Sequence, residues 1–270
     1  MNGKEFIGAL HSGRQVYGTM VTCPTPRWFE IVKELNLDCV FIDTEHNPMD
    51  WLELGWMCRA YKEIGVAPIV RIPKADAFDA CRVFDVGAEG IISAYVETPE
   101  EVMQLRSAAK LRPLKGKKLA DILSGKAKLE GEMVDYVEKR NEGHALIVNI
   151  ESVPAIEALD EILDVPGLDG IQIGPHDLSC SLGVPEQYDH PLFDEAMMTI
   201  ITKARAKNIG VGSHNLPKLD QDIRYAKAGM NLVLRLIDMT LFRRGYIEDT
   251  DKIRKALGEK GAADLGDVVN

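Results

Sequence analysis

The sequence predicts an α/β fold in which eight parallel strands close into a (β/α)8 TIM barrel, as a single domain over residues 1–270. Short apolar runs alternate with segments of helical periodicity along the chain. The runs are apolar at successive positions, which is typical of parallel strands that are covered on both faces. The length also suits one barrel-sized domain. A doubly wound open sheet is the alternative that the same alternation allows.

The first half of the chain contains four predicted strands and four predicted helices. Gly87 marks the end of one helix, since glycine readily adopts the left-handed conformation that follows a helix. Pro99 lies in the first turn of another helix, where a missing N–H costs nothing. The strands are 15–20, 38–43, 67–72 and 90–96, and the helices are 27–36, 50–65, 74–87 and 98–111. Residues 112–131 are basic and lack a strong period, so we expect a solvated loop there.

The second half of the chain continues the alternation. Strand, helix and strand follow one another between residues 145 and 174, which forms one βαβ unit. The strands are 145–150, 168–174, 208–213 and 231–238, and the helices are 132–143, 153–163, 191–210, 217–229 and 239–258. No domain linker interrupts this pattern, and we expect roughly the last ten residues to form a flexible tail.

The composition argues against several classes of protein. A net charge of −10 disfavours nucleic acid and anionic membranes as partners. The sequence contains no uninterrupted apolar run long enough to span a membrane, and its N-terminus lacks the apolar core of a signal peptide. The five cysteines are widely spaced, and we expect them to be reduced and mostly buried, as in a cytoplasmic protein.

Two acidic residues each follow a predicted strand of the central βαβ unit. Glu151 and Asp177 therefore lie at the carboxyl ends of neighbouring parallel strands, where α/β barrels build their active sites. Two converging carboxylates repel each other unless a cation lies between them, and hard oxygen ligands suit Mg²⁺ or Mn²⁺ better than Zn²⁺. Alternatively, both residues cap loops, with Asp177 at the start of the turn that follows it.

Three further residues end predicted strands on the same rim. His46 follows the second strand, three residues after Asp43, and is a candidate base oriented by that carboxylate. Alternatively, His46 bonds to loop carbonyls. Arg71 ends the apolar third strand and needs an anionic partner, either a substrate carboxylate or Asp43.

Together these residues indicate enolate chemistry. A divalent metal would chelate a 2-oxo acid, while the metal and Arg71 would stabilise the negative charge that develops on the enolate oxygen. His46 would move the proton. No lysine ends a strand where a Schiff base would need it, which favours a metal over an imine. Secondary candidates are His176 as a pocket residue or metal ligand, His214 at the rim, and Arg235 paired with an acid near the barrel mouth; His11, His144 and His190 are interpreted as loop residues.

The chain resembles the HpcH/HpaI aldolase family in five segments that occur in the family's order. These are IDTEH (42–46), VRIP (70–73), GAEGIISAYVETPEE (87–101), NIES (149–152) and GLDGIQIGPHDLSCSLG (167–183). The resemblance implies a class II, metal-dependent pyruvate aldolase for 2-keto-3-deoxy sugar acids or 4-hydroxy-2-oxo diacids such as 4-hydroxy-2-oxoheptanedioate. It further implies a divalent cation (Mg²⁺ or Mn²⁺, with Co²⁺ possible) and a homo-oligomer, a hexamer or trimer, in which the C-terminal helix packs on a neighbouring subunit.

The family's site residues fall on matching positions of this sequence. The resemblance makes Glu151 and Asp177 the metal ligands, His46 the catalytic histidine supported by Asp43, and Arg71 the catalytic arginine. The backbone at Gly174 and Pro175 would hold the pyruvate carboxylate. Five positions depart from the family pattern: Asn149 stands in place of a glutamine, His176 in place of an alanine, Ala94 in place of a proline, and Lys118-Leu119 in place of an Arg-Gly pair.

The sequence is therefore compatible with three functions. The leading hypothesis is an aldolase that cleaves a 4-hydroxy-2-oxo acid to pyruvate and an aldehyde. The alternative is other chemistry on the same enolate, either oxaloacetate decarboxylation or a citrate-synthase-like condensation. The third is a keto-acid-binding protein without catalysis, against which the complete set of rim residues argues. The sequence leaves the aldehyde, its stereochemistry and the metal open.

Overall fold

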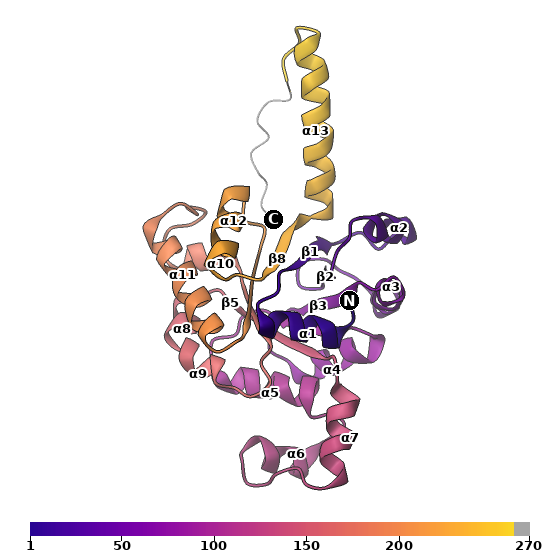
Figure 1. Ribbon diagram of the computed structural model, residues 1–270, viewed down its shortest axis with the longest axis vertical. Coiled ribbons are helices and arrows are strands. Elements are labelled where there is room, and N and C mark those ends of the chain that lie inside the picture. Colours follow the sequence, from indigo (N-terminus) through magenta and orange to yellow (C-terminus); the bar gives the residue numbers. More distant parts are fainter. Residues whose placement is uncertain (262–270) are drawn as a thin grey trace.

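A computed structural model describes residues 1–261 and shows a closed barrel of parallel strands, in which each strand pairs with its neighbours in chain order and β8 pairs with β1 (Figure 1). The barrel prediction is confirmed, and the open sheet is excluded. The strands are β1 (Val16–Val21), β2 (Cys39–Asp43), β3 (Ala67–Ile72), β4 (Gly90–Ser93), β5 (Ala145–Ile150), β6 (Gly170–Ile173), β7 (Gly210–His214) and β8 (Leu232–Ile237). The expected tail lies largely outside the described residues.

The helices surround the barrel, and most of them match the predicted segments. They are α1 (Gly3–Ser12), α2 (Pro26–Glu34), α3 (Trp51–Glu63), α4 (Ala77–Val86), α5 (Pro99–Lys110), α6 (Gly116–Leu123), α7 (Glu132–Asn141), α8 (Val153–Glu157), α9 (Leu159–Leu163), α10 (Pro175–Ser181), α11 (Pro191–Ala206), α12 (Leu219–Ala228) and α13 (Asp238–Ala256). The helix expected over 153–163 is divided at Ala158 into α8 and α9.

Helix α1 was not predicted, and it closes the amino end of the barrel. Asn2 and Glu5 form a capping box at its start, and Gly13 ends it in the left-handed conformation. Phe6 and Leu10 are fully buried among the side chains that fill the barrel. A Cβ on Gly210 would lie 2.7 Å from the Leu10 side chain, so this strand must begin with glycine to admit the helix. His11 therefore lies in a helix rather than in a loop.

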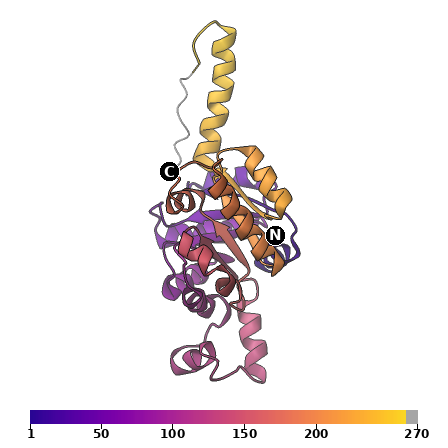
Figure 2. The same cartoon turned by 90° about the vertical axis from the view of Figure 1, so that its left-hand side faces the viewer.

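The segment 112–131 was expected to be a loop, but it contains helix α6. No residue of α6 is buried, and the helix projects with α7 from the side of the barrel opposite α13 (Figures 1 and 2). Its lysines are solvated, as expected, with the Lys117 Nζ 2.7 Å from the Asp121 carboxylate. The prediction failed because an exposed helix of two turns is stabilised by few contacts and leaves a weak periodic signal.

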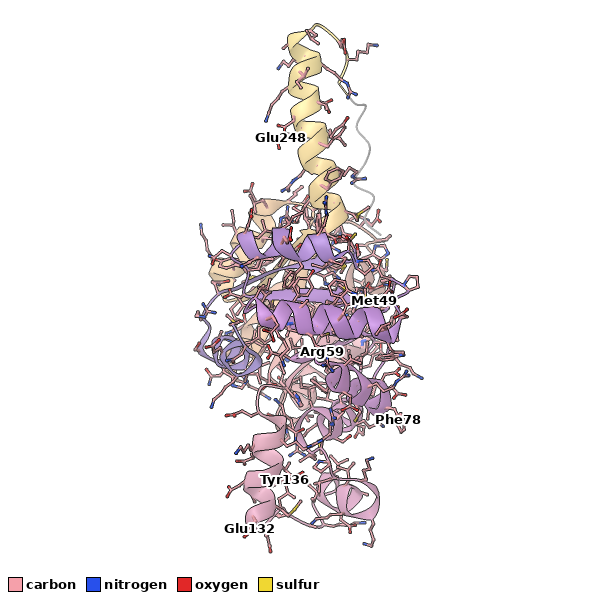
Figure 3. The ribbon with its side chains drawn as sticks, turned by 90° about the vertical axis from the view of Figure 1, so that its right-hand side faces the viewer. Met49, Arg59, Phe78, Glu132, Tyr136 and Glu248 are labelled. Atoms are coloured by element: carbon pink, nitrogen blue, oxygen red, sulfur yellow. The ribbon has the colours of Figure 1, made fainter. Side chains whose placement is uncertain are left out.

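Helix α13 extends from the barrel as a long arm (Figure 3). Apolar side chains along it are exposed, among them Met239, Phe242, Tyr246 and Ile253, and only Asp238 is buried. An apolar stripe of this length on a single chain needs a covering surface. The expectation that α13 packs on a neighbouring subunit stays a prediction. None of the described helices has the length and apolar character that crossing a membrane requires.

The cysteines are free thiols, but they are less uniformly buried than expected. Cys39 and Cys58 are buried, Cys23 and Cys81 are partly buried, and Cys180 is exposed on α10.

His144 precedes β5 and gives the fold a pH-sensitive contact. Its ring stacks on Phe84 with centroids 4.3 Å apart. Burial, followed by the charges of Arg112, Lys110 and Lys62, lowers its pKa to about 4. The unfolded chain, with a histidine pKa of about 6.5, binds a proton between pH 4 and 6.5 that the folded chain does not bind, so the fold loses stability as the pH falls through this window.

We predict that His144→Gln removes part of this pH dependence. Between pH 7 and pH 5 the wild type should lose up to about 2 kcal/mol more unfolding free energy than the variant, because the variant has no ring to protonate. Urea unfolding at pH 7, 6 and 5 measures this difference. Equal losses in the two proteins would show that folding does not lower the pKa of His144.

Candidate active site

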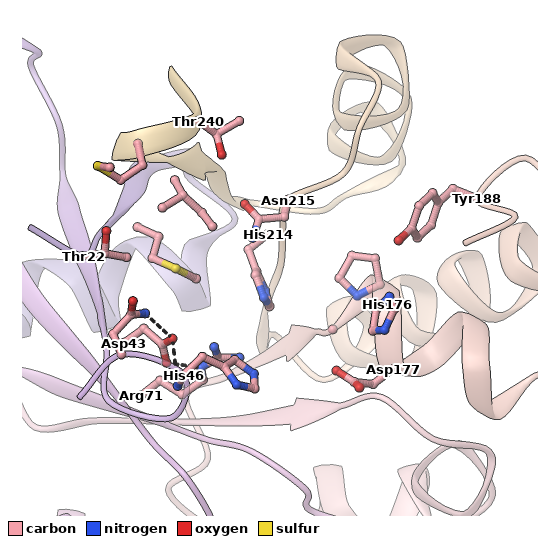
Figure 4. A pocket seen from close by; sticks show the side chains of 16 residues that line it. Thr22, Asp43, His46, Arg71, His176, Asp177, Tyr188, His214, Asn215 and Thr240 are labelled. Atoms are coloured by element: carbon pink, nitrogen blue, oxygen red, sulfur yellow. Dashed lines mark hydrogen bonds and ion pairs between the residues drawn. The ribbon is translucent and has the colours of Figure 1, made fainter. Parts of the chain in front are cut away.

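The candidate site is a cavity of about 670 Å³ at the carboxyl ends of the barrel strands (Figure 4). Its lining comes from the carboxyl-terminal parts of β1, β2, β3, β7 and β8 and from the segments that follow β1, β2, β6, β7 and β8. Seven of the nine predicted site residues line it, namely Asp43, His46, Arg71, Gly174, Pro175, His176 and Asp177. The other two, Asn149 and Glu151, are buried beside it. The parallel order of the strands brings these distant residues to one rim.

A buried ion cluster forms one side of the site. Asp43 and Arg71 are register partners on β2 and β3, so their side chains lie next to each other. The Arg71 Nε donates to Asp43 Oδ1 at 2.6 Å, and its Nη1 lies 2.9 Å from Glu45 Oε2. All three side chains are less than a tenth exposed. Arg71 thus has two carboxylate partners, of which the sequence analysis named only Asp43.

The pKa values in this cluster follow from burial and pairing. Burial raises the pKa of Asp43. The hydrogen bonds from Arg71 and from backbone N–H groups together lower it by more than burial raises it, so the net pKa lies below its usual range. Burial lowers the pKa of Arg71, yet the adjacent Asp43 and Glu45 carboxylates leave it raised overall. For Glu45, burial outweighs the attraction of Arg71 and raises the pKa. Arg71 therefore stays charged, and Asp43 is its firmly ionised partner.

The imidazole of His46 points into the cavity and is 61% exposed. The expectation that Asp43 orients this ring is wrong. Asp43 accepts a bond from the His46 backbone N–H at 3.3 Å, whereas the carboxylate nearest the ring is Glu45, with Oε2 3.7 Å from Nε2. The reason is that Asp43 ends the strand with its side chain facing Arg71, while the turn after it directs the His46 side chain away from Asp43 and into the cavity.

Glu151 is a buried carboxylate that neutral groups hold in place. Its Oε1 accepts from the Tyr95 backbone N–H at 2.9 Å, and its Oε2 accepts from Asn149 Nδ2 at 2.8 Å. Tyr95 has a φ of +54°, which ends β4 earlier than predicted and turns its N–H toward Glu151. A Cβ on Gly174 would lie 2.2 Å from Glu151 Oε2, so only glycine fits there. Asn149 thus lies behind Glu151 and outside the cavity lining.

Glu151 and Asp177 fit a divalent cation. Burial raises the pKa of Glu151 to about 7, with a further contribution from the Asp177 charge. No lysine or arginine side chain within residues 1–261 makes an ion pair with either carboxylate. Within the same residues, no histidine, cysteine or further acidic side chain joins the pair as a third protein ligand. Two carboxylates that need substrate and water to complete the coordination are typical of Mg²⁺ sites.

His176 lines the cavity from the first turn of α10. Its Nδ1 lies 3.7 Å from Glu186 Oε1, and its Nε2 lies 4.0 Å from the Cys180 sulfur. Glu186 has a φ of +59°, a conformation that favours glycine, and its backbone N–H donates to Ser179 Oγ at 3.0 Å. The ring is thus a cavity residue, as one of the two sequence hypotheses proposed, with an acid beside it.

His214 and Arg235 are each held by a contact within the protein. His214 ends β7, is 8% exposed and accepts a bond from Gln172 Nε2 at 3.1 Å. Burial lowers its pKa to about 3, so it lines the cavity as a neutral ring. Arg235 forms an ion pair with Asp222 at 3.0 Å, which is the acid partner that the sequence analysis expected.

The sequence analysis missed several residues of the site, among them Glu45, Tyr95, Tyr188 and Asn215. Glu45 lies inside a motif already quoted, where its acidic side chain was a visible signal. Tyr95 acts through its backbone, for which the sequence carries no signal. Tyr188 and Asn215 come from loops after α10 and β7 and line the cavity opposite the ion cluster.

Comparisons with known proteins match the HpcH/HpaI aldolase/citrate lyase family over residues 18–243. A hydroxypyruvate/pyruvate aldolase from Sagittula stellata is 30% identical over 88% of this chain and 93% of its own length. A 2-keto-3-deoxy-L-rhamnonate aldolase from Salmonella gallinarum is 31% identical over 77% of each chain. The crystal structure of the citrate synthase SbnG superposes with a TM-score of 0.79 at 28% identity, over 94% of this chain and 98% of that one. The chain belongs to the HpcH/HpaI aldolase/citrate lyase family.

Proposed function

We propose that this protein is a metal-dependent aldolase that cleaves a 4-hydroxy-2-oxo acid to pyruvate and an aldehyde. The observation that carries the proposal is that a buried arginine, an exposed imidazole and the Asp177 carboxylate line one cavity, with the Glu151 carboxylate buried beside it and without an ion-pair partner among the described residues. Two relatives at 30% and 31% identity are aldolases of keto acids, which supports the same reaction class.

Glu151 and Asp177 would hold the divalent cation, which we propose to be Mg²⁺ or Mn²⁺. When bound, the cation polarises the carbonyl of the keto acid and offsets the negative charge that develops on its oxygen. The hydrogen bonds from Tyr95 and Asn149 fix the orientation of the Glu151 carboxylate in advance, as the supporting partners of metal ligands do.

Arg71 supplies the second positive charge. Its Nε and Nη1 are engaged by Asp43 and Glu45, and Nη2 has no hydrogen-bond acceptor among residues 1–261. The guanidinium is thus held rigidly with one donor group free to bind the keto oxygen as charge builds up on it. The carboxylate of the keto acid would lie against the backbone at Gly174 and Pro175, where first-turn N–H groups of α10 have no intrahelical acceptor.

His46 performs the proton transfer. In cleavage, its imidazole takes the proton of the 4-hydroxyl, the C3–C4 bond breaks, and the electron pair of that bond moves into the pyruvate enolate. The hydroxyl oxygen becomes the aldehyde carbonyl. A proton then returns to C3, which completes pyruvate. Glu45, at 3.7 Å, stabilises the imidazolium that forms in between.

A second candidate is other chemistry on the same enolate, namely oxaloacetate decarboxylation or condensation with a second keto acid. The likeness to a citrate synthase structure at a TM-score of 0.79 favours it. We further propose that the protein is a cytoplasmic homo-oligomer, a hexamer or trimer, in which a neighbouring subunit covers the exposed apolar side chains of α13.

We predict that Glu151→Gln weakens Mn²⁺ binding at least about 100-fold and leaves the fold intact, because the amide keeps the size but loses the charge that a hard cation requires. Titration calorimetry with Mn²⁺ measures the affinity, and circular dichroism checks the fold. Glu132→Gln, at an exposed position on α7, is the matched control. Stoichiometric Mn²⁺ bound by the Glu151→Gln, Asp177→Asn double variant would rule out this pair as the metal site.

Arg71→Lys is predicted to lower aldol cleavage by roughly 100-fold, the scale of losing one donor to a developing oxyanion. Lysine keeps the charge beside Asp43 but loses the planar fork, so the melting temperature should fall by less than about 4 °C. Steady-state kinetics and thermal unfolding separate the two effects. A large loss of stability with near-normal turnover would assign Arg71 to structure alone.

His46→Ala is predicted to lower aldol cleavage by about 10²- to 10⁴-fold and to spare both metal binding and oxaloacetate decarboxylation. Loss of CO₂ passes through the same enolate but needs no deprotonation of a hydroxyl group. Parallel assays on a 4-hydroxy-2-oxo acid and on oxaloacetate give the comparison. If both activities fell by the same factor, His46 would be a binding residue rather than the base.

A further inference from the structure

The imidazole of His214 is a polar group of the cavity that the proposed function leaves unused. His214 ends β7, lines the cavity and is 8% exposed. In Figure 4 its ring extends from the end of the strand into the space between the ion cluster and His176. A ring that is nearly buried and still faces the cavity meets water only through the space that a substrate would occupy.

A buried glutamine fixes which nitrogen of this ring carries the proton. Gln172 on β6 is fully buried, and its Nε2 lies 3.1 Å from His214 Nδ1. An amide NH₂ group only donates, so Nδ1 is the acceptor and the proton of the neutral ring is on Nε2. Burial, with a further contribution from the Arg71 charge, lowers the pKa of the ring to about 3. His214 therefore presents an N–H donor to the cavity rather than a lone pair or a positive charge.

The interior of the barrel is shaped to admit this amide. Gln172 is the register partner of Gly212 on β7, and a Cβ on Gly212 would lie 2.2 Å from Gln172 Oε1. Any larger residue at this position, which shares a face of the strand with His214, would displace the amide. Gln172 Oε1 is buried and has no hydrogen-bond partner among the described residues. A buried amide with an unpaired oxygen lowers stability, so orientation of His214 explains its placement better than packing does.

Arg71 and His214 contact opposite sides of the same phenyl ring. Phe41 on β2 is fully buried, and the Arg71 Cζ lies 5.3 Å from the centroid of its ring. The His214 ring meets the same ring edge-on, with centroids 5.5 Å apart. The His214 Nε2 makes no hydrogen bond within residues 1–261. The shared contact with Phe41 thus brings the free donor group of Arg71 and the Nε2–H of His214 to one region of the cavity.

We propose that His214 is a further catalytic residue, which donates a hydrogen bond from Nε2 to the keto oxygen of the substrate, and that Gln172 is its positioning residue. The proposal rests on the proposed function and adds a neutral donor to the charged Arg71. Negative charge develops on the keto oxygen as the C3–C4 bond breaks, and an N–H that already points at this oxygen binds it more strongly as the charge grows. The proton stays on Nε2, since transferring it would leave an imidazolate.

The test compares His214→Asn with His214→Gln. The asparagine amide lies near the position of Nδ1 and keeps the bond to Gln172, whereas the glutamine amide reaches the position of Nε2 and keeps a donor in the cavity. His214→Asn should slow aldol cleavage, oxaloacetate decarboxylation and exchange of pyruvate methyl protons in D₂O by about 10- to 100-fold each, the scale of one hydrogen bond to a charged oxygen. All three reactions pass through the enolate, so the pattern differs from that expected of His46→Ala. His214→Gln should recover most of the loss.

The matched control is His11→Gln, at the opposite end of the barrel, where the ring lies 3.2 Å from Asp169. It should leave all three rates unchanged, and circular dichroism verifies that each variant is folded.

Gln172→Met tests the positioning role, because it removes the amide donor at nearly constant size. In ¹⁵N-labelled wild-type protein, the ¹⁵N chemical shifts of His214, assigned by comparison with His214→Asn, should identify a neutral ring protonated at Nε2. In Gln172→Met these shifts should move toward a mixture of the two tautomers. The three rates should fall together by about 3- to 10-fold, the scale of one neutral hydrogen bond. A residue that serves packing alone would leave the tautomer unchanged.

Four results would overturn the proposal. They are a wild-type ring protonated at Nδ1, wild-type rates in His214→Asn, a loss confined to aldol cleavage, and a His214→Gln variant no faster than His214→Asn. Methyl-proton exchange at equal rates in the wild type and in His214→Asn would reject His214 as a donor and keep the aldolase. A wild-type protein that catalyses none of the three reactions with Mg²⁺ or Mn²⁺ would reject the proposed function, and the role of His214 with it.

Discussion

The ion pair between Arg71 and Asp43 is the interaction on which the site depends. The two residues are register partners on adjacent strands, so the barrel itself places a guanidinium against a carboxylate at the rim. Removing one partner would leave an uncompensated buried charge, which typically costs about 3–5 kcal/mol. Glu45 forms an ion pair with the same guanidinium, and its carboxylate also lies beside the His46 ring. The arginine is thereby fixed in position, and the orientation of the imidazole is linked to it.

The other half of the site is built from the opposite kind of contact. Glu151 is held by an amide and a backbone N–H rather than by a cation. Neutral donors orient a carboxylate without neutralising it, so its charge remains available to an ion. Burial makes that charge unfavourable in the absence of a cation, as the raised pKa of Glu151 expresses. Arg71 has its counter-charge within the protein, whereas Glu151 and Asp177 need theirs from outside. Under the proposed function, this asymmetry would make one side an anion-stabilising group and the other a cation site.

The strands and the rim residues were predictable because both follow from local pattern. Apolar runs identify parallel strands, and all parallel strands of a barrel end on the same rim, so Glu151, Asp177 and Arg71 converge without further information. Side-chain direction within a turn does not follow from spacing, and for this reason Asp43 was wrongly paired with the His46 ring. Helix α1 was missed because its stability comes from packing into the barrel end, which is a tertiary contact. Tyr95 acts through its backbone, where the residue type carries no signal.

The segment after β1 and the extended helix α13 form one structural unit beside the cavity. Asp238, at the start of α13, is 2% exposed and accepts bonds from the Thr22 N–H and hydroxyl, from the Cys23 N–H and from the Met239 N–H. This carboxylate therefore joins the segment after β1 to the first turn of α13, and both segments line the cavity. Since the outer part of the helix exposes its apolar side chains, any surface that covers α13 acts on an element fixed directly to the cavity. The shape of this side of the cavity is thus determined together with the position of the arm, while the ion cluster on β2 and β3 is anchored independently within the barrel.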